Sequence, residues 1–325
     1  MPAAPNHIQF ANDCLARREA AGLAEIPAAF RGAVLTGTQG SDPFYVYGRI
    51  PWRPRQLPDE VHAFADFIHG GAPADVFPPL AAGVAAAPAD EKAVLSAYLY
   101  GFLLHYVLDR TIHPYVYYRT GFDGQGLPLG IYSMDHMRFE VALASAFVGR
   151  RPGGLAEVWR APSADGAALD AIDALFAGAF PDRAAPGQFR AAWKDYGTVR
   201  RLTRDPHGIK GTALDFFGVK SLFRAMMRPD HPPLGDRIDY ANDSRALWLR
   251  PCDGRPSAAS VPDLWEEAAR DAGRLAVFLE RAVEKGADRH EWEAAFGDLD
   301  HEGRHPGETM RYFRSAYRPS DRRLP

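Results

Sequence analysis

The segment AYLYGFLLHYVLDRTIHPYVYY, residues 97–118, contains most of an expected apolar helix. It is mainly apolar, yet His105, Asp109 and His113 follow one another at steps of four residues. On a helix with 3.6 residues per turn, such a step drifts by only about 40°, so the three side chains share one face. We expect this helix to end at Pro114, because proline lacks the N–H that continues a helix.

The same face predicts a metal site. A lone histidine on an apolar helix is usually a satisfied core residue, and that reading stays open for His105 alone. Burying the carboxylate of Asp109 costs several kcal/mol unless a positive group pairs with it. The only nearby cation on this helix, Arg110, is adjacent in sequence and points elsewhere. A divalent metal ion is therefore the natural partner of the carboxylate.

The rest of the chain also favours helices. Apolar residues recur at helical spacing, and alternating strand patterns are nearly missing. The sequence therefore predicts an all-α, multi-helix protein. The stretch RRPGG, residues 150–154, is the clearest break in the helical pattern. We therefore divide the chain there into residues 1–152 and a helical carboxy-terminal half, residues 153–325. We expect helices over residues 9–20, 59–69, 90–113, 133–148, 166–177, 188–202, 212–227 and 261–284.

Composition excludes several classes of protein. Of the 325 residues, 46% are hydrophobic and 24% are charged, and the formal net charge is −3, so a duplex nucleic acid partner is not expected. The two cysteines, Cys14 and Cys252, have no CxxC spacing and offer neither a thiolate zinc site nor a redox pair. With no signal peptide or transmembrane segment in the pattern, we expect a cytoplasmic protein. Nothing in the sequence indicates an oligomeric state.

Further metal-ligand candidates lie outside this helix. His136 and Glu140 are four residues apart in SMDHMRFEVALASAF, Asp42 lies in GTQGSDPFY, and His69 precedes two glycines in ADFIHGG. Each of these residues, taken alone, is explained as well by a surface pair or by capping of a helix or turn. The same holds for His7 near the amino terminus. Together the candidates are five histidines, two aspartates and one glutamate. This donor set suits two or three Zn²⁺ ions, with manganese or iron as the fallback.

Five stretches resemble the zinc-dependent phospholipase C family, to which the fungal single-strand-specific zinc nucleases are structurally similar. They are HIQFANDCL, GTQGSDPFY, FIHGG with the following DVF, the segment quoted above, and HMRFE. The resemblance is to a bacterial subgroup without secretion signals. It implies a phospholipase C-like helical bundle with a multinuclear metal cleft, and it covers about the first 150 residues.

Carried over to this chain, the family pattern assigns each ligand to an ion. Asp42, His69, His105 and Asp109 would hold a first zinc, and His113, His136 and Glu140 a second. Asp109 would bridge to a third zinc, held also by His7. Secreted members complete that third site with a processed amino-terminal tryptophan, whereas Met1-Pro2-Ala3 precedes His7 here.

The resemblance implies a metal-dependent phosphodiester hydrolase of phospholipase C type that uses a zinc-activated water. Asp42 would be its catalytic residue, as general base or water orienter, beside its role as ligand. The substrate would be a phosphodiester such as a phospholipid head group. Two other functions stay open: a nuclease or small-molecule phosphoesterase on the same metal cluster, and a non-catalytic metal-binding protein.

Overall fold

The computed structural model describes residues 4–18, 23–50, 52–219, 221–227 and 237–325. They form a mainly helical structure with two short antiparallel ribbons, which confirms the predicted all-α class. The first half holds α1 (Ala4–Ala16), the 3₁₀ helix η2 (Ala28–Phe30), α2 (Arg31–Gly37), α3 (Asp42–Tyr45), α4 (Pro58–Gly70), α5 (Pro73–Ala86), α6 (Ala89–Thr120), α7 (Ile131–Leu143) and the π-helix η3 (Ala144–Val148). The second half holds α8 (Gly154–Trp159), α9 (Gly166–Ala179), α10 (Gln188–Thr203), α11 (Ile209–Phe216), α12 (Leu222–Ala225), β1 (Trp248–Leu249), β2 (Pro256–Ser257), α13 (Val261–Lys285), α14 (Arg289–Phe296), β3 (Phe313–Arg314) and β4 (Arg322–Arg323).

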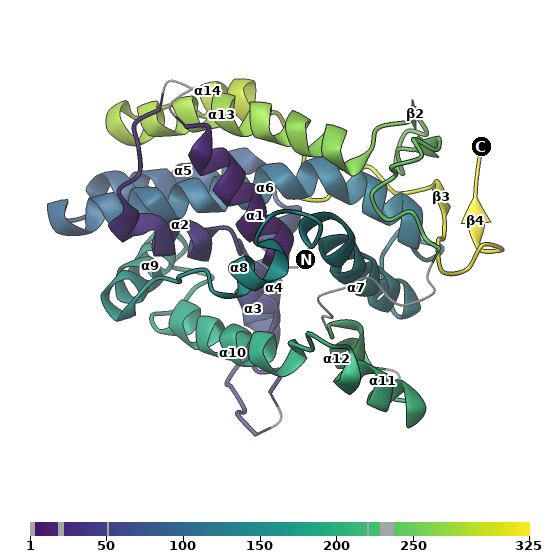
Figure 1. The fold of residues 1–325 in the computed structure, drawn as a ribbon. Helices are drawn as coiled ribbons and strands as arrows, with labels where there is room; N and C mark the ends of the chain where they lie inside the picture. Colours follow the sequence, from purple (N-terminus) through teal and green to yellow (C-terminus); the bar gives the residue numbers. More distant parts are fainter. Residues whose placement is uncertain (1–3, 19–22, 51, 220, 228–236) are drawn as a thin grey trace.

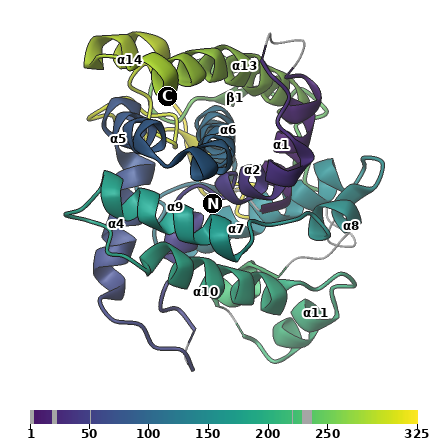
Figure 2. The ribbon, with the colours of Figure 1, turned by 90° about the vertical axis from the view of Figure 1, so that its left-hand side faces the viewer.

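The 32-residue helix α6 is the axis of the molecule. Helices α1, α2, α5, α7, α9 and α13 all pack against it. Figure 1 shows α6 crossing the centre beneath α13, and Figure 2 shows it end-on with the other helices around it. Because α6 is covered on most sides, it is apolar around most of its circumference, as a core helix should be.

Two glycines allow α2 and α6 to touch through their backbones. A Cβ added to Gly37 would overlap the carbonyl oxygen of Tyr98, and one added to Gly101 would overlap the carbonyl of Val34. This close approach holds the segment that follows α2 against the face of α6 that carries His105. That segment contains Asp42, the first residue of α3.

The predicted end of the central helix at Pro114 is wrong, because α6 continues through this residue to Thr120. Proline removes a helical hydrogen bond at a cost of about 3 kcal/mol. The residues that follow it, Tyr115 and Val116, are almost completely buried in the core. Burying two such side chains contributes about as much as the lost hydrogen bond costs, so packing keeps the helix intact.

Other helix boundaries also differ from the prediction. The first helix begins at Ala4, not at residue 9, and so includes His7. The expected helix over residues 212–227 is divided into α11 and α12, with Gly218 at a positive φ of 68° between them. Helix α5 escaped prediction because Pro78 and Pro79 lie inside it.

One principal hydrophobic core holds residues of both halves of the chain, from Ile8 of α1 to Phe296 of α14. In α13, Ser260 and Asp263 form a capping box that starts the helix, and its apolar face packs on α6. None of the described helices is apolar over a length that would cross a lipid bilayer.

Candidate metal centre

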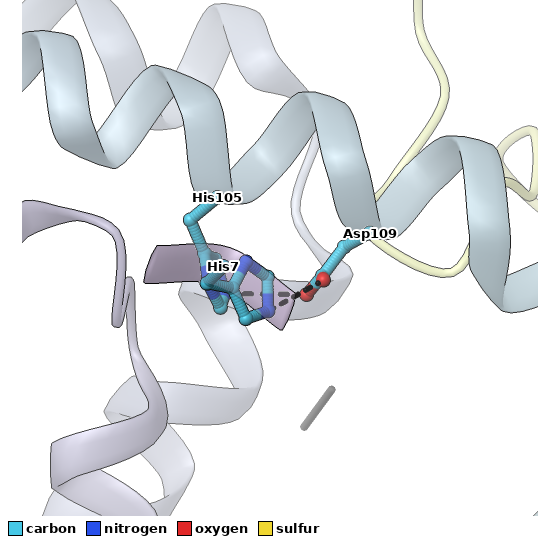
Figure 3. A group of neighbouring side chains, drawn as sticks. All are labelled: His7, His105 and Asp109. Atoms are coloured by element: carbon cyan, nitrogen blue, oxygen red, sulfur yellow. Dashed lines mark ion pairs between the residues drawn. The ribbon is translucent and has the colours of Figure 1, made fainter. Parts of the chain in front are cut away.

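The first group of ligands joins α1 to α6. The Nε2 atoms of His7 and His105 lie 3.2 Å from the two carboxylate oxygens of Asp109, His7 from Oδ1 and His105 from Oδ2. Figure 3 shows both rings directed at this carboxylate. The two imidazole rings stack with their centroids 4.3 Å apart. All three side chains are completely buried.

A second group adds the end of α4. The Nε2 atom of His69 lies 3.5 Å from Oδ2 of Asp109, and His113 completes this group. His69 occupies the last turn of α4, and the chain leaves the helix at Gly71. The glycines after His69 thus allow the helix to end where its last side chain meets α6.

The third group joins α6 to α7. Nε2 of His113 lies 3.3 Å from Oε1 of Glu140, and Nε2 of His136 lies 2.9 Å from the same oxygen. Within each of the three groups, the ligand atoms all lie within 4.8 Å of one another. Since Asp109 belongs to the first two groups and His113 to the last two, the groups form one continuous chain of ligands.

These separations fit shared metal ions. Two ligand atoms that each lie about 2.0–2.1 Å from a tetrahedral zinc are about 3.3 Å apart. Ligand pairs in all three groups have separations close to this value. The groups can therefore hold divalent ions without a large rearrangement of the helices.

The backbone fixes which nitrogen of two histidines faces the carboxylates. Nδ1 of His105 lies 3.0 Å from the carbonyl oxygen of Thr38, and Nδ1 of His113 lies 2.8 Å from that of His301. A carbonyl only accepts, so Nδ1 carries the hydrogen and Nε2 is left for a metal. Burial lowers the pKa of His105 well below its usual value, which keeps this ring neutral. Its Nε2 lone pair then faces a carboxylate oxygen, an arrangement that a cation between them stabilises.

Buried atoms without hydrogen bonds lead to the same conclusion. Among the described residues, both oxygens of Asp109 and the Nε2 atoms of four of these histidines are buried and accept or donate no hydrogen bond. The four are His7, His69, His105 and His113. A buried polar atom left in this way costs about 1–3 kcal/mol, so a run of them in one place fits the binding of a cation. No Lys or Arg in the described part of the chain compensates, since Arg110 turns away to Tyr106, Phe296 and Asp271.

The structure brings together seven of the eight predicted ligands but leaves Asp42 outside the three groups. Asp42 begins α3 and is buried, and its Oδ1 has no hydrogen-bond partner. Burial raises the pKa of Asp42 well above its usual value, and the nearby carboxylates of Asp109 and Glu140 raise it further. The chain just before Asp42 packs closely on His105 at Gly40, because a Cβ at this position would overlap the imidazole ring. Residues Met1 to Ala3, where the family has its terminal tryptophan, lie outside the described residues.

A cleft of about 590 Å³ adjoins the ligands. His69 and His136 are part of its wall, together with Glu302 and two of the aromatic residues near the cluster, Tyr45 and Tyr117. The remaining lining residues are Val46, Arg49, Asp66, Pro128, Ser133, Met137, Val199 and Met226.

Two residues of the site, His301 and Glu302, were missed by sequence reasoning. The backbone N–H of His301 donates to the carbonyl of His69 at 3.1 Å, and its ring stacks on that of His69 at 4.9 Å. Its own carbonyl holds His113, so one residue ties two ligands from different helices. Oε1 of Glu302 lies 3.7 Å from Nδ1 of His69. The signal was the HEGRH run at residues 301–305, which is far from the other ligands in sequence.

Comparison with known proteins gives no relative for this chain: no family model matches it, and neither a curated protein nor a solved structure does.

Proposed function

We propose that this chain is a metal-dependent phosphodiester hydrolase of phospholipase C type. One observation supports the proposal above others: the cleft has His69 and His136 in its wall, and these belong to different ligand groups. A phosphodiester in the cleft would therefore face two metal positions at once. Sites with clustered divalent ions suit phosphoryl chemistry, because two ions contact both the attacking and the leaving oxygen.

Divalent ions at these positions would supply acidity to a water molecule and positive charge to the phosphoryl oxygens. The protein's contribution is to hold the ligands rigidly, through the carbonyls of Thr38 and His301. Asp42 is the proposed proton acceptor, since its buried Oδ1 has no hydrogen-bond partner. Cations held beside it would oppose the burial and the neighbouring carboxylates that raise its pKa, and so favour the ionised form that accepts a proton. Tyr45 and Tyr117 give the cleft an aromatic wall for the organic part of the substrate.

The experiment compares two substrate classes on one preparation. Purified protein is assayed on a short-chain phosphatidylcholine and on a single-stranded oligonucleotide, before and after chelation and after zinc is restored. We expect chelator to abolish release of diacylglycerol, zinc to restore it, and the oligonucleotide to be cut more slowly or not at all. Preference for the oligonucleotide would instead favour the nuclease function on the same ligands.

The bond that breaks gives a second test. In water labelled with heavy oxygen, attack on phosphorus places the label in the released phosphomonoester, whereas attack on carbon places it in the diacylglycerol. We expect the label in the phosphomonoester only. Metal-loaded, folded protein that hydrolyses neither substrate class would contradict the lipase and nuclease assignments and favour a binding role.

A further inference from the structure

Large apolar side chains that face solvent are unevenly distributed. Among the described residues, nine of the twelve lie in three segments, residues 46–57, 127–131 and 209–219, and only Leu247, Val277 and Leu324 lie elsewhere. The most exposed are Phe216 at 84% and Phe217 at 76%. The nine, which we call the apolar rim, are Trp52, Leu57, Leu127, Leu129, Ile131, Ile209, Phe216, Phe217 and Val219.

Two of the three rim segments contribute residues to the wall of the cleft described above. The first segment also supplies Val46 and Arg49 to the cleft wall, and the second supplies Pro128. The third leads into α12, after which Met226 lines the cleft. Figures 1 and 2 both show α11 and the loop between α3 and α4 on the lower side of the molecule, with the loop below α10 and α11 beside it. Two of the segments thus adjoin the cleft of the candidate active site, and the third precedes a cleft residue in the chain.

The chemistry of the rim resembles that of surfaces that enter a lipid interface. The rings of Phe216 and Phe217 meet edge to face at 5.3 Å, so they present one joint apolar tip. The loop from Val46 to Leu57 combines Trp52 with three arginines and contains no carboxylate; Asp59 and Glu60 follow it in α4. Aromatic and leucine side chains beside basic ones bind bilayer interfaces, especially anionic ones.

The arginines of this loop are not all neutralised. Arg53 and Arg55 share the single buried carboxylate of Asp195, at 3.1 and 2.9 Å. The guanidinium of Arg49 lies against His62, at 3.4 Å. The loop therefore presents positive charge next to Trp52.

We propose that the apolar rim docks the protein on an anionic phospholipid surface, with the cleft facing the lipid. This inference rests on the proposed function, because it names where the substrate comes from. A lipid would enter the cleft between the three segments without crossing open water. Binding to the surface itself needs no catalysis and is measured separately.

The test uses sedimentation with vesicles of phosphatidylcholine containing phosphatidylglycerol. We expect the unmodified protein to bind. The double variant Phe216→Ala/Phe217→Ala should bind at least about tenfold more weakly, because it loses two inserting rings. Val277→Ala, on α13 and away from the rim, is the matched control and should bind normally. Trp52→Ala is a second variant in a different segment, in case the double variant is not folded by circular dichroism.

A paired assay separates docking from catalysis. The double variant should lose hydrolysis of lipid in vesicles in proportion to binding, while its rate on a monomeric short-chain phosphatidylcholine stays within about twofold. Hydrolysis of monomeric lipid by a protein that binds no vesicle would overturn the docking proposal alone. Vesicle binding without any phospholipid hydrolysis would overturn the proposed function alone. A dimer in light scattering that Phe216→Ala/Phe217→Ala dissociates would show the rim to be an interface between copies of this chain, against the proposal.

Discussion

Asp109 and Asp195 are both completely buried carboxylates, yet their surroundings are opposite. Asp195 accepts hydrogen bonds from Arg53, from Arg55 and from the backbone N–H of Gly48. Asp109 accepts none and is surrounded by the Nε2 atoms of His7, His69 and His105.

The difference shows how to separate a structural carboxylate from a metal-binding one. The protein itself compensates the charge of Asp195, which ties the 46–57 loop to α10. In the described part of the chain only imidazoles face Asp109, and a metal ion held among them would compensate its charge. Substitutions at the two positions should therefore have different consequences.

The largest effect is expected from Asp109→Asn. The amide loses the charge that two ligand groups share, so bound metal should fall from about two to three equivalents to one or none. Asp195→Asn is the matched control, since it changes an equally buried carboxylate and should keep its metal. Elemental analysis of both variants checks this, and loss of metal from Asp195→Asn alone would reverse our assignment.

The same pair should differ in stability without metal. Asp195→Asn leaves two guanidiniums without their partner, and we expect it to lower the free energy of unfolding by about 2–3 kcal/mol. With chelator present, Asp109→Asn should lower the free energy of unfolding less than Asp195→Asn does, because Asp109 has imidazoles and no guanidinium as its partners in the described part of the chain. Urea unfolding measures both, and strong destabilisation of metal-free Asp109→Asn would contradict the account.

Gly40→Ala tests the support behind His105. Its new Cβ would overlap the imidazole ring, and with φ at 51° the position also disfavours a side chain. We expect metal affinity to fall about 10- to 100-fold, as for other losses of ligand orientation. Gly187→Ala is the control: φ is 86°, but a Cβ there meets no atom within 4 Å. Equal affinity losses in both variants would point to backbone strain and not to His105.

His301→Ala should weaken metal binding about tenfold, because the ring that stacks on His69 is removed. His305→Ala, in the same turn but exposed, should have no effect.

His7→Ala should cost less metal than Asp109→Asn, since His105 still faces the shared carboxylate. Competition titration with a zinc chelator ranks these variants, and His7→Ala equal to Asp109→Asn would refute the order of sites.

The smallest effect concerns pH. The guanidiniums and the N–H around Asp195 outweigh its burial and lower the pKa of this carboxyl, so its stabilisation is present above its unfolded pKa and is lost only as pH falls below about 4. Metal-dependent stabilisation requires neutral imidazoles and should fade at higher pH than this, beginning near the ordinary histidine pKa of about 6.5, while the lowered pKa of His105 extends the range downwards. Melting temperatures with and without chelator should converge in that range. A chelator effect that persists below about pH 4 would contradict histidine ligation.

Local patterns predicted the part of the site that lies on helices. His105, Asp109 and His113 follow from one helical face, and His136 with Glu140 from a single i, i+4 step. These inferences work because a helix fixes the relative directions of its own side chains. Asp109 was predicted as a metal ligand because its helix face carries no cation, and Arg110 does turn away to Tyr106 and Phe296.

Contacts between distant segments escaped prediction for a physical reason. His301 and Glu302 reach the site only because the chain after α14 folds back on α6, and no periodicity encodes that return. Helix α6 passes Pro114 because core packing outweighs a local preference. The ligand partition that the family pattern implies places Asp42 with His69 and His105, whereas the structure groups His105 with His7. Which atoms share an ion depends on how three helices dock, and the sequence does not contain that geometry locally.

The central claim is that the buried histidines and carboxylates around Asp109 hold metal ions. Elemental analysis of folded protein, purified without chelator, tests it most directly. We predict about two to three equivalents of a zinc-like divalent metal per chain. A metal content near zero, in protein whose circular dichroism and cooperative unfolding show it to be folded, would contradict the claim.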